Sequence, residues 1–364
     1  MAYTTIDDGS EYFTTTLWTG SGTSSGRSIT NSANAGNFKP DWLWIKPRTG
    51  TNATHHQLYD SSRGVSKSLR SSDSVAEVAS SAYGHVSAFD TNGFTSVAGS
   101  NNNENINENS STFVAWQWKA NGGTTTSFTE SGSNPGGNYQ ANTTAGFSIV
   151  TYTGTGSNGT VQHGLSSAPE LVIVKQRDDD EHDWQTGSDF LTSWAYRLKL
   201  NDDVSQASVA TSFNSTAPTS SVFTVGSNSD VNEDAHGYVG YCFHSVQGYS
   251  KIGKYTGNGN TDGPFVYTGF KPAWWLGKKV DAAENWFLID NARHPINDGN
   301  IPRVIPNNTD AESEDSSIAG DFLSNGFKIR ATQNMINNSG STYFFMAFAE
   351  HPFVSSKGVP VTAR

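Results

Sequence analysis

The stretch YTGTG at residues 152–156 has two counterparts in the chain, WTGSG at 18–22 and YTGNG at 255–259. Downstream of each lies a proline, then an apolar run, then a lysine six residues after the proline. These segments are PDWLWIK at 40–46, PELVIVK at 169–175 and PAWWLGK at 272–278. A chance match would not keep further features at a fixed distance, so we interpret the pattern as internal duplication.

Two more features keep the same register. A phenylalanine follows the proline after 54 residues in the first two copies and after 55 in the third. The pairs are Pro40 and Phe94, Pro169 and Phe223, and Pro272 and Phe327. An aromatic-rich segment then closes each copy: FVAWQW at 113–118, YVGYCF at 238–243 and YFFMAF at 343–348. Because the proline, the phenylalanine and the closing segment recur at matching distances, we predict three related units of about 100 residues, the size of one β-domain.

The duplication gives the expected domain organisation. Residues 120–145 are rich in Gly, Ser, Thr and Asn, which is typical of a linker or long loop. We therefore expect an N-terminal arm at 1–12, units at 13–119, 146–247 and 248–353, a linker at 120–145 and a tail at 354–364.

The composition favours strands over helices. Only 16% of the 364 residues are charged, and polarity comes from Ser, Thr, Asn and 36 Gly, which disfavour helix interiors. The runs WLWI and LVIV are apolar at every position, as expected for strands covered on both faces. The sequence predicts an all-β chain of three tandem β-sandwich units of jelly-roll or lectin-like type.

Local signals add two finer expectations. The Asn-Gly pairs at 92–93 and 325–326 predict tight type I′ hairpins. The stretches at 74–82 and 188–198 are the places where short helices are expected.

The charge and cysteine content exclude several classes of protein. A net charge of −11 without a basic stripe argues against a nucleic-acid partner. Cys242 is the single cysteine, so no internal disulfide framework can form. No stretch is apolar enough for membrane insertion, and residues 1–10 lack the features of a secretory signal. We expect synthesis and folding in a cytoplasm.

An acidic run is the candidate metal site. The segment RDDDEHD at 177–183 places several carboxylates in succession, and carboxylate oxygens are the ligands that Ca²⁺ prefers. The candidate ligands are Asp178, Asp179, Asp180 and Glu181. The alternative is a solvated loop tip, where like charges avoid burial. Apart from this candidate Ca²⁺ site, we expect no cofactor.

Candidate ligand-binding residues come from two patterns. An Asp-x-x-Arg element occurs twice, as Asp60 with Arg63 and as Asp290 with Arg293. Each pair could orient a bound sugar, or could be a structural ion pair or turn cap that recurs with the framework. Trp184 and Trp286 lie outside the framework strands, so we expect them to be more exposed than the other tryptophans and able to stack on a sugar.

No catalytic constellation stands out in the sequence. We find no convincing pair of carboxylates for glycoside hydrolysis and no nucleophile in the required context. Three sister units also suit a scaffold or multivalent binder better than a single unsymmetrical active site. We expect a protein that is not an enzyme, and a glycan-processing enzyme is the remote alternative.

Several segments resemble one known family. They are MAYTTIDDGSEYFTTTLWTGSG at 1–22, KPDWLWIK at 39–46, LYDSSRGVSKSL at 58–69, FDTNGF at 89–94 and VAWQWKA at 114–120. The chain resembles repeat-bearing virion structural proteins of marine tailed bacteriophages, described as tail-fibre proteins with lectin-like β-sandwich modules. The resemblance is closest over residues 1–120. It implies a location on the outside of a virion and carries over no catalytic residues.

Composition and resemblance together give the functional expectation. It is a bacteriophage structural protein exposed on the particle, a tail fibre or tail appendage involved in host attachment. Capsid decoration is the alternative, because the sequence lacks the heptad pattern of a coiled-coil anchor. The expected partners are other virion proteins, further copies of the chain in a homo-oligomer, and a host-surface glycan.

Overall fold

The chain folds almost entirely into antiparallel β-sheets. The computed structural model describes residues 4–32, 36–49, 54–79, 82–101, 105–298, 301–314 and 318–349. Strands make up 40% of the structure and helices 5%, which confirms the all-β expectation. Within these residues, no helix is long and apolar enough to cross a bilayer.

Three large sheets share one strand order. The first has the order β1 (Phe13–Thr19), β7 (Thr112–Trp118), β3 (Trp42–Pro47) and β4 (Gln57–Asp60). The second contains β10 (Phe147–Thr153), β17 (Gly237–Phe243), β12 (Leu171–Gln176) and β13 (Gln185–Ser188) in the same arrangement. The third contains β18 (Ser250–Thr256), β26 (Thr342–Phe348), β20 (Trp274–Lys279) and β21 (Phe287–Asp290).

The second and third sheets are longer than the first. The second adds β14 (Tyr196–Lys199) and β15 (Ala207–Ser208) at one edge, and β9 (Gly137–Asn142) and β8 (Thr126–Phe128) at the other. The third adds β22 (Pro302–Val304) and β23 (Ser313–Glu314) beyond β21.

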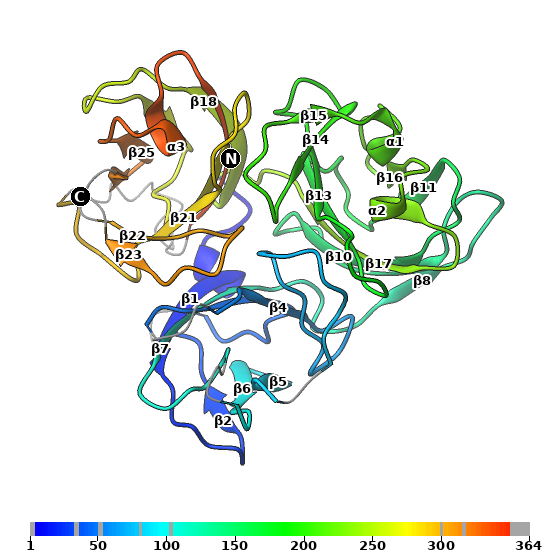
Figure 1. Ribbon diagram of the computed structural model, residues 1–364, viewed down its shortest axis with the longest axis horizontal. Coiled ribbons are helices and arrows are strands. Elements are labelled where there is room, and N and C mark those ends of the chain that lie inside the picture. The colour runs from blue at the N-terminus through cyan, green and yellow to red at the C-terminus, as the bar shows by residue number, and fades with distance from the viewer. Residues whose placement is uncertain are drawn as a thin grey trace.

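A small sheet accompanies each large one. These are β2 (Arg27–Ile29), β6 (Gly93–Val97) and β5 (His85–Asp90); β11 (Gly159–Gln162) and β16 (Val222–Val225); and β19 (Phe265–Tyr267), β25 (Gly326–Ile329) and β24 (Gly320–Leu323). We call each large sheet with its small sheet a lobe and number the lobes 1 to 3 in chain order. Figure 1 shows the three lobes arranged around a common centre.

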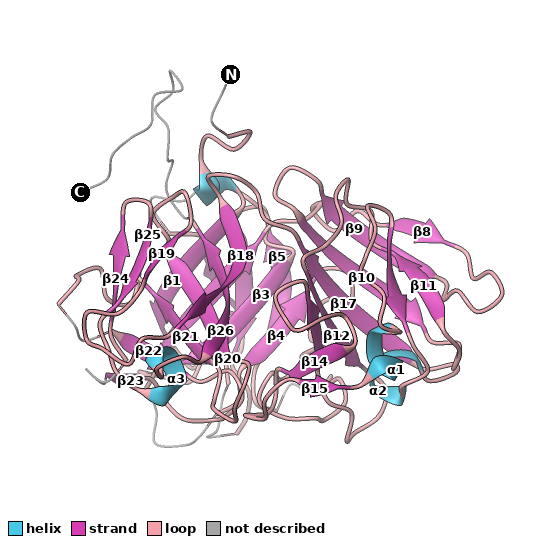
Figure 2. Ribbon diagram, turned by 90° about the horizontal axis from the view of Figure 1, so that it is seen from above, coloured by secondary structure: helices cyan, strands magenta, loops and turns pink. Residues whose placement is uncertain are grey.

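Helices are short in the described residues. They are the 3₁₀ turn η1 (Gly9–Glu11) and the one-turn helices α1 (Ala210–Phe213), α2 (Ser229–Asn232) and α3 (Asn334–Asn337). The last three lie on one side of the molecule and η1 on the opposite side (Figure 2).

Each large sheet is covered on both faces, and its side chains alternate between two cores. In β3, Trp42 and Trp44 belong to a core that all three lobes share, whereas Leu43 and Ile45 face the small sheet of lobe 1. This alternation follows from the two-residue period of a strand. It explains why the run WLWI is apolar at every position.

The shared core joins the lobes through aromatic rings. Ring centroids lie 4.5 Å apart for Trp42 and Tyr241, 5.4 Å for Trp118 and Trp274, and 6.1 Å for Phe243 and Phe348. These contacts connect lobes 1 and 2, 1 and 3, and 2 and 3. The lobes are therefore packed around one interior, whereas the sequence led us to expect sandwiches in tandem.

The aromatic–Thr-Gly-x-Gly pattern has a structural explanation in each lobe. Its aromatic ring packs edge-on against the phenylalanine that keeps register downstream. The pairs are Trp18 with Phe94 at 5.6 Å, Tyr152 with Phe223 at 6.2 Å and Tyr255 with Phe327 at 6.1 Å between centroids. A Cβ on Gly20 would lie 2.0 Å from the carbonyl oxygen of Glu108, and Gly22 has a φ of +64°, so both positions require glycine.

Three local expectations from the sequence are corrected. In the hairpins, the two residues between the paired strands are Thr91 and Asn92, and Ser324 and Asn325, so the glycine opens the second strand and is not the second turn residue. Residues 74–79 and 188–198 form no helix: the first stretch is irregular and held by a bridge between Ser68 and Val78, and the second contains turns, bends and the start of strand β14, while residues 80 and 81 lie outside the described residues. Residues 120–145, expected to be a linker, contain β8 and β9 and extend the sheet of lobe 2.

Candidate functional site

The two Asp-x-x-Arg elements form buried ion pairs. Arg63 Nε lies 2.5 Å from Asp60 Oδ2, and Arg63 N donates to Asp60 Oδ1 at 2.8 Å. Arg293 and Asp290 repeat these contacts at 2.5 and 2.9 Å. All four side chains have 0% exposed surface. The sugar-orienting role is therefore corrected, because a bound sugar cannot reach groups that protein atoms surround.

Each of these carboxylates also receives a hydrogen bond from a neighbouring lobe. Tyr241 of lobe 2 donates to Asp60 Oδ2 at 2.8 Å, and Trp116 of lobe 1 donates to Asp290 Oδ2 at 3.0 Å. Burial alone would lower the pKa of Arg63, but the charges of Asp60 and Glu77 and the hydrogen bond with Asp60 outweigh it and raise that pKa. The pairs thus fasten one lobe to the next.

Two glutamates extend these pairs across the boundaries between lobes, which we call seams. Glu77 accepts from Arg63 Nη1 at 2.9 Å within lobe 1 and from Arg177 Nε of lobe 2 at 3.0 Å. Burial raises the pKa of Glu77, but its hydrogen bond from Arg177 and the charge of Arg63 produce a net lowering. Glu312 makes the corresponding contacts with Arg293 at 2.9 Å and with Arg48 of lobe 1 at 2.8 Å.

The exposure expected for Trp184 and Trp286 is wrong. Their exposed fractions are 0% and 1%, and both belong to the shared core. The indole N–H of Trp184 donates to the carbonyl of Arg70 at 2.7 Å, and that of Trp286 donates to the carbonyl of Lys199 at 2.8 Å. Each ring reaches across a seam, a long-range contact that sequence position does not reveal.

His56 takes the corresponding position in lobe 1. Its Nδ1 accepts from Trp44 Nε1 at 2.8 Å, so Nε2 carries the proton and donates to the carbonyl of Ile305 in lobe 3 at 3.0 Å. Burial, followed by the charge of Lys46, holds the pKa of His56 well below its ordinary value. The ring is therefore a neutral, fixed link between two lobes.

Sequence reasoning missed a role for the lysine that ends each apolar run. Lys46, Lys175 and Lys278 are fully buried, and each donates across a seam to a carbonyl of another lobe. The acceptors are Thr309 of lobe 3 at 3.1 Å, Ser74 of lobe 1 at 3.3 Å and Asp203 of lobe 2 at 3.0 Å, in that order. Burial lowers the pKa of Lys46 to about 7 and those of Lys175 and Lys278 to about 8.

These contacts run in one direction around the molecule: from lobe 1 to lobe 3, from lobe 3 to lobe 2 and from lobe 2 to lobe 1. Three backbone hydrogen bonds join the same pairs of lobes, but their donors and acceptors run in the opposite direction. They are Glu77 N to Arg177 O, Gln206 N to Val280 O and Glu312 N to Arg48 O, at 2.8, 2.9 and 3.2 Å. The recurring lysine signal was visible in the sequence, but its partners were not.

The acidic run is divided among different contacts. Asp178 accepts from Gly237 N, Asp180 accepts from Ala76 N of lobe 1 at 2.8 Å, and Glu181 has a φ of +72°. Of the four candidate metal ligands, Asp179 alone joins a cluster, with Glu233 and His236, whose ligand atoms lie within 4.8 Å of one another. His236 Nδ1 is 3.2 Å from Asp179 Oδ2, so these two side chains already contact each other as in an ion pair.

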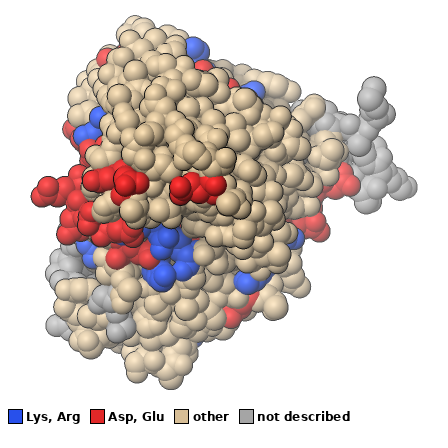
Figure 3. Space-filling view, turned by 90° about the vertical axis from the view of Figure 1, so that its right-hand side faces the viewer, with Lys and Arg blue, Asp and Glu red and all other residues tan. Residues whose placement is uncertain are grey.

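One face of the molecule gathers charged side chains. Figure 3 shows acidic side chains gathered in a band on one face, with a small group of basic side chains beside it. A face of this kind repels polyanions.

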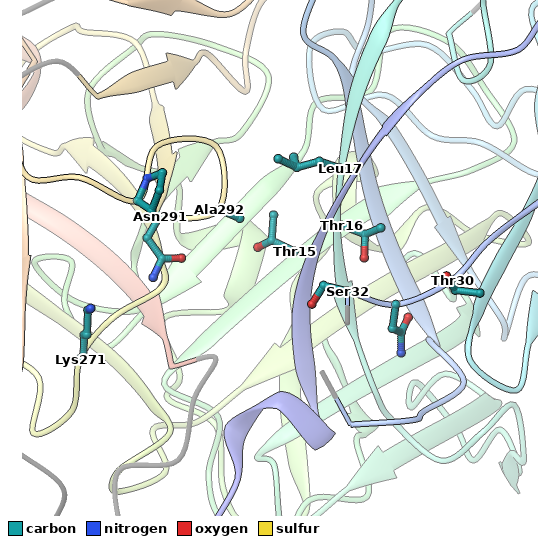
Figure 4. Close-up of a pocket in the computed structure, with 10 residues that line it drawn as sticks. Thr15, Thr16, Leu17, Thr30, Ser32, Lys271, Asn291 and Ala292 are labelled. Atoms are coloured by element: carbon teal, nitrogen blue, oxygen red, sulfur yellow. The ribbon is translucent and has the colours of Figure 1, made fainter. Parts of the chain in front are cut away.

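A groove between lobes 1 and 3 has a volume of about 640 Å³. Its walls come from β1, from residues 30–32 and from the loop after β21 (Figure 4). Hydroxyl, amide and aliphatic side chains line it, together with Lys271. Its lining offers hydrogen bonds and apolar contact, the means of recognising a partner.

Comparison with known proteins places the whole arrangement in one family. No curated protein matches the sequence. A family model described as a domain of unknown function (DUF7483) matches residues 8–352. The matched range includes all three lobes and residues 120–145, and it shows that the chain belongs to the DUF7483 family.

Proposed function

We propose that this chain is a rigid structural building block of a bacteriophage particle, exposed on the virion as a tail fibre or tail appendage that contacts the host. Two lines of reasoning support the proposal. The segments quoted above resemble tail-fibre proteins of marine phages, and the buried polar side chains fasten lobes together.

The observation that carries the structural role is the cycle of contacts between lobes. Lys46, Lys175 and Lys278 each bind a carbonyl of another lobe, and two of the three seams add a buried Asp–Arg pair. When a lobe moves, the buried polar groups lose their hydrogen bonds to the neighbouring lobe, and each group left unsatisfied costs about 1–3 kcal/mol. Such a body resists deformation, as a component under mechanical load requires.

A second candidate is capsid decoration. The three-lobed outline in Figure 1 favours it, because a body with three similar lobes would suit a position of local threefold symmetry on a shell.

Antibody labelling of intact particles of the encoding phage tests the proposal. Label on tails supports the tail assignment, label on heads supports decoration, and particles without label contradict both. Binding of the purified protein to host cells that surface polysaccharide abolishes would support attachment. Turnover of such a polysaccharide, lost when one carboxylate is replaced, would contradict the structural role.

A further inference from the structure

The lobes differ in what lies on the outer side of the first strand of each large sheet. β1, β10 and β18 each pair antiparallel with the closing strand of their lobe. In lobe 2 the other side of β10 pairs with β9. Among the described residues, β1 and β18 stand at the edges of their sheets.

In lobe 2, strand β9 occupies the edge of β10 that corresponds to the open edge of β1 in lobe 1. Gln140 lies opposite Ile149 of β10 and is 1% exposed. Its Nε2 donates to the hydroxyls of Ser61 and Ser62 in lobe 1, at 2.8 and 2.6 Å. An extended strand with an amide side chain thus occupies the gap between β10 and the neighbouring lobe.

The groove of about 640 Å³ lies at the corresponding place beside β1. Asn291 of lobe 3 takes the position of Ser61, since each follows the aspartate of an Asp-x-x-Arg element. Each also donates its backbone N–H, Ser61 to Asp41 O and Asn291 to Ala273 O, both at 2.9 Å. Figure 4 shows Asn291 and Ala292 across the groove from Thr15 and Leu17.

The backbone of β1 directs hydrogen-bonding groups into this groove. Tyr12 O accepts from Lys119 N and Gly20 N donates to Ser111 O, so the even-numbered residues face β7. Because antiparallel strands alternate, the N–H and C=O groups of Thr15 and Leu17 face the open side. A row of outward-facing backbone N–H and C=O groups allows a further strand to pair with the edge.

Two buried polar atoms in the groove lack a partner among the described residues. They are Oγ1 of Thr15 and Oδ1 of Asn31, on side chains that are 2% and 6% exposed. Other buried polar atoms of the described residues also lack a partner, but these two are the ones that line the groove. A donor on an added strand would satisfy them.

The edge of β18 differs from that of β1. Ser250 N donates to Val246 O at 2.9 Å, and Ile252 N donates to Ser245 Oγ at 3.0 Å. The chain itself therefore caps the start of this edge, and the cavity beside it is smaller, about 330 Å³.

We propose that the groove beside β1 binds one extended segment of a partner polypeptide, which pairs antiparallel with β1 and places an amide side chain opposite Thr15. β9 provides the argument for this occupant, because it fills the corresponding gap in lobe 2. Residues 30–32 and the loop after β21 line the groove, which favours a single strand over the wider sheet edge of a second copy. The segment is uncharged, as β9 is. The inference holds whether or not the chain belongs to a virion.

A fluorescent peptide with the sequence of residues 135–145, which contains β9, is the probe. It is titrated against the full chain by anisotropy. Leu17→Pro removes an outward N–H from β1, and proline is tolerated on an edge strand in that orientation. Leu17→Ala keeps the N–H and controls for the side chain, and Lys254→Pro makes the same change at the equivalent position of β18. Circular dichroism checks that all variants fold.

We expect saturable binding to the wild type, to Leu17→Ala and to Lys254→Pro. We expect binding to Leu17→Pro to be weaker by about tenfold, which corresponds to about one net hydrogen bond. A photo-reactive group beside the peptide's glutamine should cross-link to lobe 1 or to the loop after β21.

Three outcomes overturn the proposal. The peptide fails to bind the wild type, it binds Leu17→Pro and Leu17→Ala equally, or Lys254→Pro alone weakens it. A dimer that Leu17→Pro abolishes, without peptide binding, would show instead that a second copy occupies the edge.

Discussion

The hydroxyl of Tyr241 in lobe 2 donates a hydrogen bond of 2.8 Å to Oδ2 of Asp60 in lobe 1. The same oxygen accepts from Arg63, so one carboxylate joins a strand of one lobe to the turn of another. Burial, followed by the charge of Asp60, raises the pKa of Tyr241 well above its ordinary value, and the hydroxyl therefore stays protonated as a donor. A small number of such contacts determines how the lobes are held together.

Replacing this carboxylate should destabilise the whole chain. In Asp60→Asn, Arg63 keeps its position but loses the charge that compensates its burial. We expect the free energy of unfolding to fall by about 3 kcal/mol, the cost of removing one partner of a buried pair. Denaturant unfolding measures it. The control is Asp262→Asn, whose side chain is 79% exposed and which should change stability little. Equal effects of the two substitutions would contradict the role of Asp60.

The buried lysines predict a dependence of stability on pH. Burial lowers the pKa of Lys46 to about 7 and that of Lys175 to about 8, whereas an unfolded lysine titrates near pKa ~10.4. Between these values the unfolded chain binds more protons, so the free energy of unfolding rises as pH increases from about 7 to about 10. Above about pH 10 the trend reverses, because burial raises the pKa of Tyr59 to about 12 and unfolded tyrosines ionise first.

Thermal melting across this pH range measures the effect. Lys175→Met removes one of the amines and should flatten the rise, although its carbonyl partners lose a donor and the variant is less stable at every pH. A wild-type profile that falls between pH 7 and pH 9, or an unchanged slope in the variant, would show that these amines do not titrate as buried groups.

The β8–β9 segment should contribute to stability as part of lobe 2. Gln140→Ala removes the hydrogen bonds to Ser61 and Ser62 and leaves Gly123 N without its acceptor. We expect a loss of about 1–3 kcal/mol in denaturant unfolding. Ser127→Ala, on an exposed part of the same hairpin, serves as the control. If Gln140→Ala left the free energy of unfolding unchanged, this would support the prediction that residues 120–145 are a linker.

Thr15→Val should change the stability of the free protein and its binding of the peptide in opposite directions. Within the described part of the chain the buried hydroxyl of Thr15 has no partner, so an apolar side chain of the same shape should raise the melting temperature of the free protein. The variant should also bind the peptide of residues 135–145 more weakly than the wild type. A lower melting temperature would mean that the hydroxyl already has a partner.

The sequence predicted the parts of the fold that depend on local pattern. Trp42 to Ile45 read as a strand covered on both faces because every position is apolar, and the structure places alternate residues in two cores. The recurrence of Asp60 with Arg63 as Asp290 with Arg293 also marked a shared feature. Its partner Tyr241 lies 181 residues away, and no local pattern identifies it.

What the sequence could not predict is how the lobes pack. Trp184 lies outside the framework strands, which suggested exposure, but it is buried in the shared core and donates to the carbonyl of Arg70 in another lobe. Residues 120–145 have the composition of a linker, yet Tyr139 and Gln140 pair with β10 because a free strand edge was available there. In both cases a long-range contact outweighs local composition.

Differential scanning calorimetry of the full chain tests most directly whether the three lobes form one body around a shared core. We expect a single transition whose van't Hoff enthalpy equals the calorimetric enthalpy, and which Asp60→Asn shifts as a whole to lower temperature. Separate transitions, or a van't Hoff enthalpy near a third of the calorimetric value with only part of the profile shifted by Asp60→Asn, would contradict it.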